Sequence, residues 1–392
     1  MPTLSTNSTL QKGVEKASAN KPYFGNLDFL RVVAFVMVFG LHTKLTATLG
    51  LLSSNTYYQL LLGTVFDGAL GVSFFFALSG FLITYLLLGE VASTGRVALR
   101  NFYMRRFLRI WPLYYVVLVF GFWLYPEIKM LLGMDFIVAN QGPWYWSFLS
   151  NFDSIYLHHH GLQDKSVSFL NITWSVAIEE QFYLLWPLLF VLVPRRHYPV
   201  AMGLVILTST GFRFLHRTDH ATLYFHTLSV ASDLAMGGLA SWYCLHSSQF
   251  LTTIKRLPKA LIIGVYVLGF AHLVFRDTLY NTPDTVAFSR LVHCVFFLFI
   301  ILEQNFAENS PVKLSRFRLV SRVGKYTYGL YLLHPIAIQI TDLTMRLGAI
   351  SSAFLSGLIY VVSAALLSFL LAYCSYHYLE APFLKLKHRF SS

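Results

Sequence analysis

The chain has 392 residues, of which 56% are hydrophobic and 17% are aromatic, and its formal net charge is +12. Only 12% of the residues are charged, whereas a soluble globular protein carries roughly 25%. This composition excludes a soluble globule and a disordered chain, and it predicts an all-α protein that crosses a membrane many times. Three cysteines are too few for a disulfide framework.

In chain order, residues 1–25 are polar and predict a flexible cytoplasmic tail rather than a cleaved signal peptide. About ten apolar stretches follow, each long enough, or nearly so, to cross a bilayer. They cover residues 27–47, 64–88, 107–125, 172–193, 198–216, 226–246, 259–276, 286–304, 325–347 and 353–379. We expect one membrane domain over residues 26–384 with a long outer loop at 126–171, and a basic cytoplasmic tail at 385–392.

The lysines and arginines predict the orientation of these spans. If the N-terminus is cytoplasmic, 20 of them lie in cytoplasmic segments, 7 lie on the opposite side, and Arg31, Arg109 and Arg213 lie inside spans. This asymmetry follows the positive-inside rule and places both termini in the cytoplasm. It also explains the positive net charge without a nucleic-acid partner.

The first predicted span contains an arginine and a histidine on one helix face. Arg31 and His42 are eleven residues apart, which is about three helical turns and about 16 Å along the axis. A cation at one end and an imidazole deeper in the membrane suit an enzyme that grips an anionic donor and activates a nucleophile. The alternative is that Arg31 reaches the lipid headgroups and His42 hydrogen-bonds a neighbouring helix.

Three further arginines precede the third span. Arg105 and Arg109 are one turn apart, with Arg106 beside them. Guanidinium groups bind phosphates in bidentate fashion. The other interpretation is that the cluster serves membrane orientation and anionic lipid. Arg109 favours the phosphate interpretation, because an arginine that far into the span needs a partner.

The fourth span begins with Trp174, followed by the adjacent carboxylates Glu179 and Glu180, near the expected outer face. One interpretation is that the two carboxylates only stabilise the helix, through a favourable interaction with the dipole at its N-terminus. The functional hypothesis is that the two carboxylates hydrogen-bond a polyhydroxylated acceptor while Trp174 offers it an apolar ring face.

Two more ionisable residues lie in late spans. His334 precedes Pro335 in the ninth span, and its alternative role is a hydrogen bond between helices. Glu380 closes the last span at the cytoplasmic end, where we expect an ion pair with Arg31 or with the arginine cluster. Intramembrane ionisable residues are functional candidates by default.

Taken together, six segments resemble the acyltransferase-3 family of integral-membrane acyltransferases and occur in that family's order. They are Leu27-Asp28 with Arg31 and His42, the Phe74–Ile83 run, Arg105-Arg106 through Tyr114, Trp174 through Tyr183, Tyr328 through His334, and Glu380-Ala381-Pro382. Two departures are visible. Phe29 stands where the family often has glycine, and the sequence shows no extracytoplasmic esterase-like domain, so we expect the stand-alone form.

The resemblance implies transfer of an acyl group, most often acetyl, from cytoplasmic acyl-CoA to a carbohydrate hydroxyl such as that of an O-antigen or another surface polysaccharide. It implies a bacterial inner membrane as the location. It assigns the CoA phosphates to Arg31, Arg105, Arg106 and Arg109. It makes His42 the general base, with Glu380 and His334 as further catalytic candidates, and it assigns the acceptor side to Trp174, Glu179 and Glu180.

Three alternatives stay open. The first alternative is an enzyme of the same class whose acceptor is a small hydrophobic metabolite of the macrolide type rather than a polymer or a lipid-linked sugar. Outside it, the chain is a secondary transporter, although spans 1–5 and 6–10 lack the paired motifs that transporters often show, or a lipid-binding partner of a flippase. We expect no metal, because His158, His159 and His160 have no cysteine or acid at ligand spacing.

Overall fold

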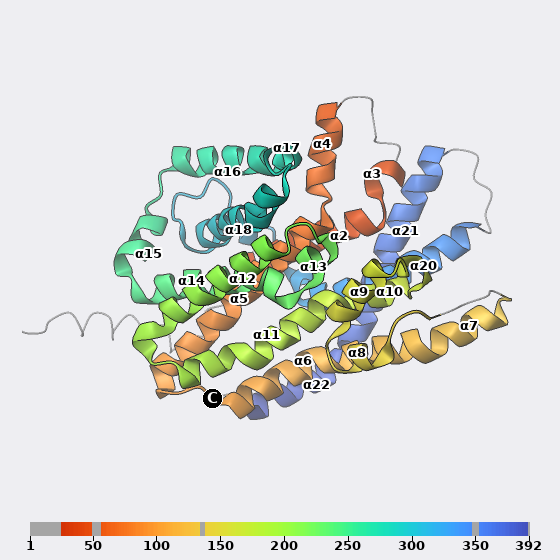
Figure 1. Cartoon of the computed structure of the whole chain (residues 1–392), viewed down its shortest axis with the longest axis horizontal. Coiled ribbons are helices and arrows are strands. Elements are labelled where there is room, and N and C mark those ends of the chain that lie inside the picture. The colour runs from red at the N-terminus through yellow and green to blue at the C-terminus, as the bar shows by residue number, and fades with distance from the viewer. Residues whose placement is uncertain (1–24, 49–55, 134–137, 347–352, 391–392) are drawn as a thin grey trace, which may run out of the picture.

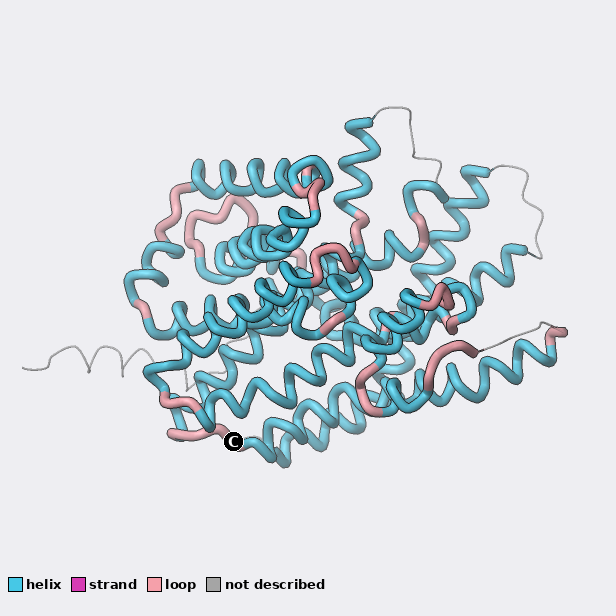
Figure 2. Tube along the Cα trace, viewed as in Figure 1, coloured by secondary structure: helices cyan, strands magenta, loops and turns pink. Residues whose placement is uncertain are grey.

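The computed structural model describes residues 25–48, 56–133, 138–346 and 353–390. Every regular element in these ranges is a helix (Figure 2), which confirms the all-α class. The expected tail at residues 1–25 lies outside the described residues, apart from Gly25. Figure 1 shows α6 (Leu99–Val119) and α11 (Thr173–Leu192) running along the longest axis of the molecule.

Seven helical segments are long and apolar enough to cross a membrane. They cover Gly25–His42, Gln59–Thr94, Leu99–Leu131, Phe169–Leu192, Arg195–Leu215, Pro283–Phe306 and Leu355–Phe390. A pair of helices, α15 (Ser248–Lys255) and α16 (Lys259–Val274), passes the same test together but is bent by 89°. The described residues therefore support seven spans, or eight if the bent pair forms one.

This number is lower than the ten spans expected from the sequence. The expected spans at 226–246 and 325–347 do form helices, α14 (Thr227–His246) and α20 (Thr327–Arg346), but neither is among the candidate spans. Each contains a fully buried polar side chain, Asp233 in α14 and His334 in α20. These helices are partly polar because they pack inside the protein, where hydrogen-bonding partners replace lipid.

The helices α5 (Gly68–Thr94) and α14 cross closely at the centre of the molecule. A Cβ atom on Gly80 would overlap the backbone carbonyl of Leu234, and one on Gly237 would overlap that of Ala77. Small residues at such crossings let two helix backbones approach. The crossing holds the middle of α5 in a fixed place beside α11.

The first helix, α2 (Gly25–His42), packs against α5 and α20 through one apolar face. Leu27, Leu30, Ala34 and Val38 follow a three- and four-residue spacing, and all are buried. Arg31, four residues after Leu27, lies at the edge of this face, with 19% of its side chain exposed. Packing on both sides therefore fixes the rotation of α2, and with it the directions of Arg31 and His42.

The C-terminal segment returns along α6. The last long helix, α21 (Ala353–Cys374), continues into a π-helical turn, η6 (Ser375–Glu380), and then into α22 (Ala381–Leu386), and Figure 1 shows α22 beside α6. Arg105 joins the two, because its Nη1 donates to the backbone oxygen of Phe390 at 2.8 Å. The second terminal nitrogen of Arg105, Nη2, forms an ion pair with Glu90 Oε2 at 3.1 Å.

The expected outer loop at 126–171 is largely helical and packs against the membrane helices. Its buried Tyr145 receives a hydrogen bond from Asn140 at 2.6 Å, and the Tyr145 carbonyl accepts one from Tyr114 of α6 at 2.8 Å. The helices of this region are α7 (Tyr125–Leu131), α8 (Gly142–Trp146), α9 (Ser150–His159) and α10 (Ser168–Asn171).

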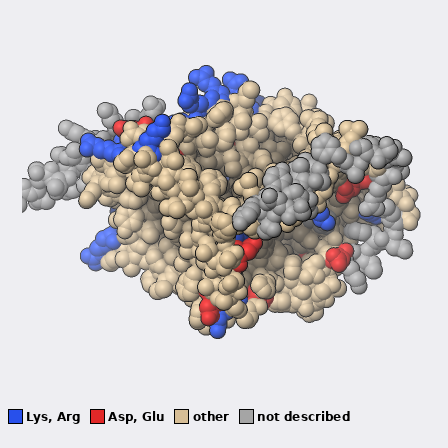
Figure 3. Space-filling model, turned by 90° about the horizontal axis from the view of Figure 1, so that it is seen from above, with Lys and Arg blue, Asp and Glu red and all other residues tan. Residues whose placement is uncertain are grey.

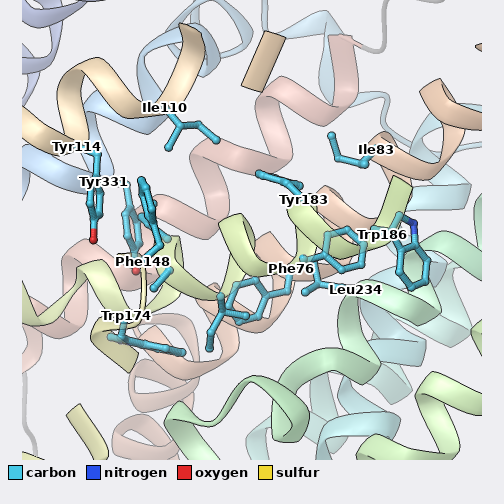
Figure 4. Packing of buried hydrophobic residues seen from close by; sticks show 14 of the residues in the cluster. Phe76, Ile83, Ile110, Tyr114, Phe148, Trp174, Tyr183, Trp186, Leu234 and Tyr331 are labelled. Atoms are coloured by element: carbon cyan, nitrogen blue, oxygen red, sulfur yellow. The ribbon is translucent and has the colours of Figure 1, made fainter. Parts of the chain in front are cut away.

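Two further long helices, α12 and α18, and several short ones complete the architecture. Their bounds are α3 (Leu45–Thr48), α4 (Thr56–Val65), α12 (Tyr198–Leu215), α13 (His220–Phe225), α17 (Arg276–Leu279), α18 (Pro283–Phe306) and α19 (Arg318–Val323). Figure 4 shows the main hydrophobic cluster, in which Tyr114, Phe148 and Tyr331 lie towards one side and Ile83 and Trp186 towards the other.

The surface is mostly free of charge in the view from above. Figure 3 shows lysine and arginine atoms gathered over the left half and the upper edge, while uncharged atoms cover most of this face. Charged side chains are costly in hydrocarbon. A broad uncharged surface is therefore what a membrane-spanning protein presents to lipid.

Candidate active site

Two cavities follow each other along α2. The first, of about 370 Å³, is lined by Arg31, Arg106 and Arg109 among others, and we call it the arginine cavity. The second, of about 400 Å³, lies at the other end of α2 and is lined by His42, and we call it the histidine cavity. Arg31 and His42 therefore line different cavities, although they belong to the same helix.

Val72 of α5 and Tyr331 of α20 line both cavities, and we call these two residues the shared wall. The hydroxyl of Tyr331 is within 2.6 Å of the Ser175 hydroxyl, and this hydrogen bond is buried. Phe75 packs edge-on against the Tyr331 ring at 5.8 Å between centroids. The two cavities are thus separated by the thickness of one side chain layer.

The arginine cavity is strongly charged. Five cationic and three anionic side chains line it, namely Arg31, Arg106, Arg109, Lys325, Lys387, Asp28, Glu179 and Glu380. Arg31 is held by Asp28 through an ion pair of 2.8 Å one helical turn away. The excess of positive charge suits an anionic ligand, because guanidinium groups match phosphate oxygens in geometry and charge.

The three arginines at the start of α6 differ in their surroundings. Arg106 lies over the rings of Phe102 and Tyr183 at 5.6 Å from each centroid, and its buried Nε has no hydrogen-bond partner in the described structure. Arg109 lines the cavity beside it. Arg105 instead ties α6 to α5 and to the C-terminal segment. The expectation that all three face one ligand therefore holds geometrically for Arg106 and Arg109 only.

Glu179 lines the arginine cavity and not the histidine cavity, which differs from the acceptor-side placement expected from the sequence. Its carboxylate accepts hydrogen bonds from Ser79 at 2.7 Å and from Tyr183 at 3.0 Å. Glu180 points elsewhere and accepts from the indole Nε1 of Trp111 at 2.9 Å. The two neighbouring carboxylates thus bind different helices rather than one common ligand.

Glu380 is also in the arginine cavity, but the expected ion pair with Arg31 is not formed in the described structure. Arg31 pairs with Asp28 instead, while Glu380 accepts a hydrogen bond from Ser375 at 3.1 Å within the π-helical turn. Only 4% of Glu380 is exposed. Single π-helical turns are frequent at functional sites, and this one turns the Glu380 carboxylate towards the cavity.

The two intramembrane histidines meet at the other end of α2. The distance between His42 Nδ1 and His334 Nε2 is 2.7 Å, and the rings are stacked with centroids 5.0 Å apart. His334 is fully buried, and its Nδ1 lies 2.8 Å from the carbonyl of Tyr331 and 3.1 Å from that of Leu330. His42 lines the histidine cavity.

These contacts assign the protons on both rings. A carbonyl oxygen only accepts hydrogen bonds, so His334 Nδ1 carries the proton and His334 Nε2 is an acceptor. His42 must then donate from Nδ1, which leaves its Nε2 with a free lone pair. An imidazole in this tautomer is ready to take a proton through Nε2.

Trp174 lines the histidine cavity, on the side where the sequence places the acceptor. Its ring packs against Tyr224 at 5.0 Å and against Phe225 at 5.1 Å. The cavity lining also includes the polar side chains of Gln163, Asn171 and Gln339, and its described part contains no lysine or arginine. It combines aromatic surface with amide side chains and one carboxylate, that of Asp342.

The three neighbouring histidines at the end of α9, His158, His159 and His160, have separate partners. His158 Nδ1 lies 2.8 Å from the Ser154 carbonyl, and His159 Nε2 lies 3.1 Å from Asp219. Among the described residues, no group of three His, Cys, Asp or Glu side chains is placed to hold a metal ion.

Several residues of the site escaped the sequence reasoning. Ser79 lies beside Gly80 in the Phe74–Ile83 run, and such a small residue indicates helix packing, yet its hydroxyl donates to Glu179 and it lines the arginine cavity. Tyr331 and Val72 carry no charge and therefore gave no signal in a search for intramembrane ionisable groups. The available signal was position, because Tyr331 lies three residues before His334 and shares a helix face with it.

The sequence as a whole matches one protein family. The sequence model of the acyltransferase-3 family, described as an acyltransferase domain, matches residues 24–377. The peptidoglycan O-acetyltransferase OatA of Listeria monocytogenes is 27% identical over 93% of this chain and 56% of its own length. The O-acetyltransferase OatA of Staphylococcus aureus is 30% identical over 81% of this chain and 53% of its own length. The chain thus spans about half the length of these relatives, and no solved structure matches it.

Proposed function

The chain belongs to the acyltransferase-3 family, and on this premise we propose that it transfers an acyl group, most often acetyl, from acyl-CoA to a hydroxyl of a carbohydrate. The observation that carries the proposal is the pair of cavities that meet at Tyr331 and Val72. One is suited to an anionic donor and the other to a neutral acceptor with a base at its edge.

The donor enters the arginine cavity. Arg31, Arg106 and Arg109 bind the CoA phosphates, and each charge-assisted hydrogen bond contributes about 1.5–3 kcal/mol. The unpaired Nε of buried Arg106 supports this role, because a ligand oxygen would satisfy it. The pantetheine arm then extends towards the shared wall and brings the thioester close to the histidine cavity.

His42 is the general base of the proposed reaction. Its Nε2 takes the proton of the acceptor hydroxyl, the hydroxyl oxygen attacks the thioester carbonyl, and the carbon–sulfur bond breaks. The ester forms on the acceptor, and the CoA thiolate leaves and takes up a proton. His334 is a positioning residue in this scheme, because its Nε2 holds His42 in the required tautomer. Glu380 lies on the donor side.

The acceptor is a neutral, polyhydroxylated unit. A cavity with aromatic rings, amide side chains and no cation in its described lining suits sugar hydroxyls better than phosphates or uronates. One relative is named as acting on peptidoglycan, which favours a surface polysaccharide or a lipid-linked sugar. A small hydrophobic metabolite of the macrolide type is the second candidate, because Trp174 and its neighbours also offer apolar surface.

We place the donor side in the cytoplasm, with both termini on that side and residues 26–384 forming one domain. The excess of lysines and arginines on this side supports that orientation. A bacterial inner (plasma) membrane is the location that the family resemblance implies. Trp174 belongs to the acceptor side in this arrangement, and Glu179 belongs to the donor side.

The experiment is acyl transfer in proteoliposomes with radiolabelled acetyl-CoA on one face and a chito-oligosaccharide or a macrolide on the other. The proposal predicts an acetylated acceptor detected by mass spectrometry, and none with His42→Ala. If acetyl-CoA is not consumed with any acceptor while a substrate crosses the membrane, the transporter alternative replaces the enzyme.

A further inference from the structure

A third cavity, of about 450 Å³, lies apart from the two already described. It is formed where α2 begins and α18 ends, and α19 closes it with Arg318, Ser321 and Arg322. We call it the α19 cavity. It shares no lining residue with the arginine cavity or the histidine cavity.

The two arginines of the α19 cavity carry unneutralised charge. Arg318 and Arg322 are four residues apart in one helix, so their side chains leave from the same face. Both are exposed, and neither is in an ion pair with a described residue. Two guanidinium groups one turn apart form a site for an anion with several oxygens.

Buried polar atoms in the same cavity lack partners. Ser321 is only 9% exposed, and its hydroxyl has no hydrogen-bond partner in the described structure. The Oδ1 atom of Asn305 is also buried and unpartnered, while its amide nitrogen donates to the Ile301 carbonyl at 2.7 Å. Unmade hydrogen bonds of buried groups are costly. A ligand with an anionic oxygen for Ser321 and a hydroxyl for Asn305 would satisfy both.

The position of the α19 cavity indicates that such a ligand comes from the membrane. Gly25 begins one candidate membrane span and Phe306 ends another, so the cavity lies at the level where two spans leave the membrane. Next to the arginines, the apolar side chains of Phe317 and Leu319 are 52% and 77% exposed. Cationic and apolar side chains side by side are typical of a segment that lies in the lipid headgroup region.

We propose that the α19 cavity binds the headgroup of an anionic phospholipid with a free headgroup hydroxyl, such as phosphatidylglycerol. Arg318 and Arg322 bind the phosphate, and the Ser321 hydroxyl donates to one of its oxygens. The headgroup hydroxyl donates to Asn305 Oδ1, while Phe317 and Leu319 contact the acyl chains. This site is independent of acyl transfer, since none of these residues lines the other two cavities.

The test measures binding of short-chain phosphatidylglycerol to the purified full chain in detergent by calorimetry. Phosphatidylcholine of the same chain length and glycerol phosphate are the comparison probes. The variants are Arg318→Gln with Arg322→Gln, and Ser321→Ala. The matched control is Arg195→Gln with Arg196→Gln, which removes another exposed arginine pair of the same predicted membrane side.

We expect saturable binding of phosphatidylglycerol that weakens at least tenfold in the double arginine variant and in Ser321→Ala, and that the control variant retains. Turnover of acetyl-CoA in phosphatidylcholine nanodiscs should be unchanged in all variants, which shows that they are folded. Equal affinity for phosphatidylglycerol in wild type and both cavity variants would overturn the site. Binding of glycerol phosphate as tight as that of phosphatidylglycerol would overturn its assignment to a lipid.

Discussion

The contact between His42 and His334 makes a quantitative prediction. When His42 takes a proton during transfer, its Nδ1 hydrogen bond to His334 Nε2, 2.7 Å long, changes from a neutral to a charge-assisted bond. Such a bond contributes about 1.5–3 kcal/mol, and about 1.4 kcal/mol corresponds to a factor of ten in rate. His334→Ala should therefore lower kcat about ten- to a hundredfold.

His334→Gln is the matched variant for this prediction, because its amide oxygen can accept the bond from His42 Nδ1. We expect it to lose less than tenfold in kcat. The KM for acetyl-CoA should stay the same in both variants, since His334 is remote from the arginine cavity. The assay is CoA release under saturating acceptor, with thermal unfolding as a check on stability. Wild-type kcat in His334→Ala, or equal losses in both variants, would refute the positioning role.

Three further predictions concern the shared wall, the helix crossing and the outer region. Val72→Ala opens the wall, so the kcat/KM ratio of butyryl-CoA to acetyl-CoA should rise about tenfold, the scale of a methylene in a pocket. Val176 lines the arginine cavity but not the histidine cavity, so Val176→Ala should leave this ratio unchanged. Equal ratios in the wild type and both variants would contradict the role of the shared wall. Gly80→Ala should lower the melting temperature, because the new Cβ atom would overlap the backbone of α14. In the control Gly89→Ala, in the same helix, the new Cβ atom meets no neighbour, so this variant should be as stable as wild type or more stable. Equal melting temperatures of the two variants would argue against the close crossing. Burial raises the pKa of Asp153 from 3.8 to about 6, so the folded state prefers the protonated acid and loses up to about 3 kcal/mol of stability as the pH rises from 4 to above 6. Asp153→Asn should remove that dependence in melting curves between pH 4 and 7, and an unchanged pH profile would contradict it.

Much of the site followed from spacing along single helices. The separation of eleven positions between Arg31 and His42 predicted one face and a large axial distance, and the structure places the two residues in successive cavities along one helix. The family motifs made His334 a further catalytic candidate, but they did not predict its contact with His42. That contact depends on the neighbouring helix, because His42 of α2 and His334 of α20 meet only through tertiary packing.

The side on which Glu179 lies could not be derived from the sequence. It follows Trp174 by five residues, which corresponds to about 140° around a helix and about 7.5 Å along it. The two side chains therefore point to different cavities, and the sequence does not fix which face meets which cavity. Arg105 shows the same limit, because its partners Glu90 and Phe390 are distant in the chain.

Ten spans were expected, whereas seven helices of the described residues, or eight with the bent pair, are long and apolar enough to cross a membrane. The expected spans at 226–246 and 325–347 account for the difference, because α14 and α20 carry buried polar side chains and are not among these helices. Their buried Asp233 and His334 have protein partners, a serine and an arginine in the first case and a histidine in the second.

In the proposed enzyme, donor binding and proton transfer occupy separate cavities. The most direct measurement is acetyl-CoA affinity by calorimetry together with CoA release, for wild type, His42→Ala and Arg109→Ala. We expect His42→Ala to bind acetyl-CoA as tightly as wild type without transferring acetyl. We expect Arg109→Ala to bind it about ten- to a hundredfold more weakly, through the loss of one charge-assisted contact. Wild-type transfer by His42→Ala, or unchanged acetyl-CoA affinity in Arg109→Ala, would contradict this separation of roles.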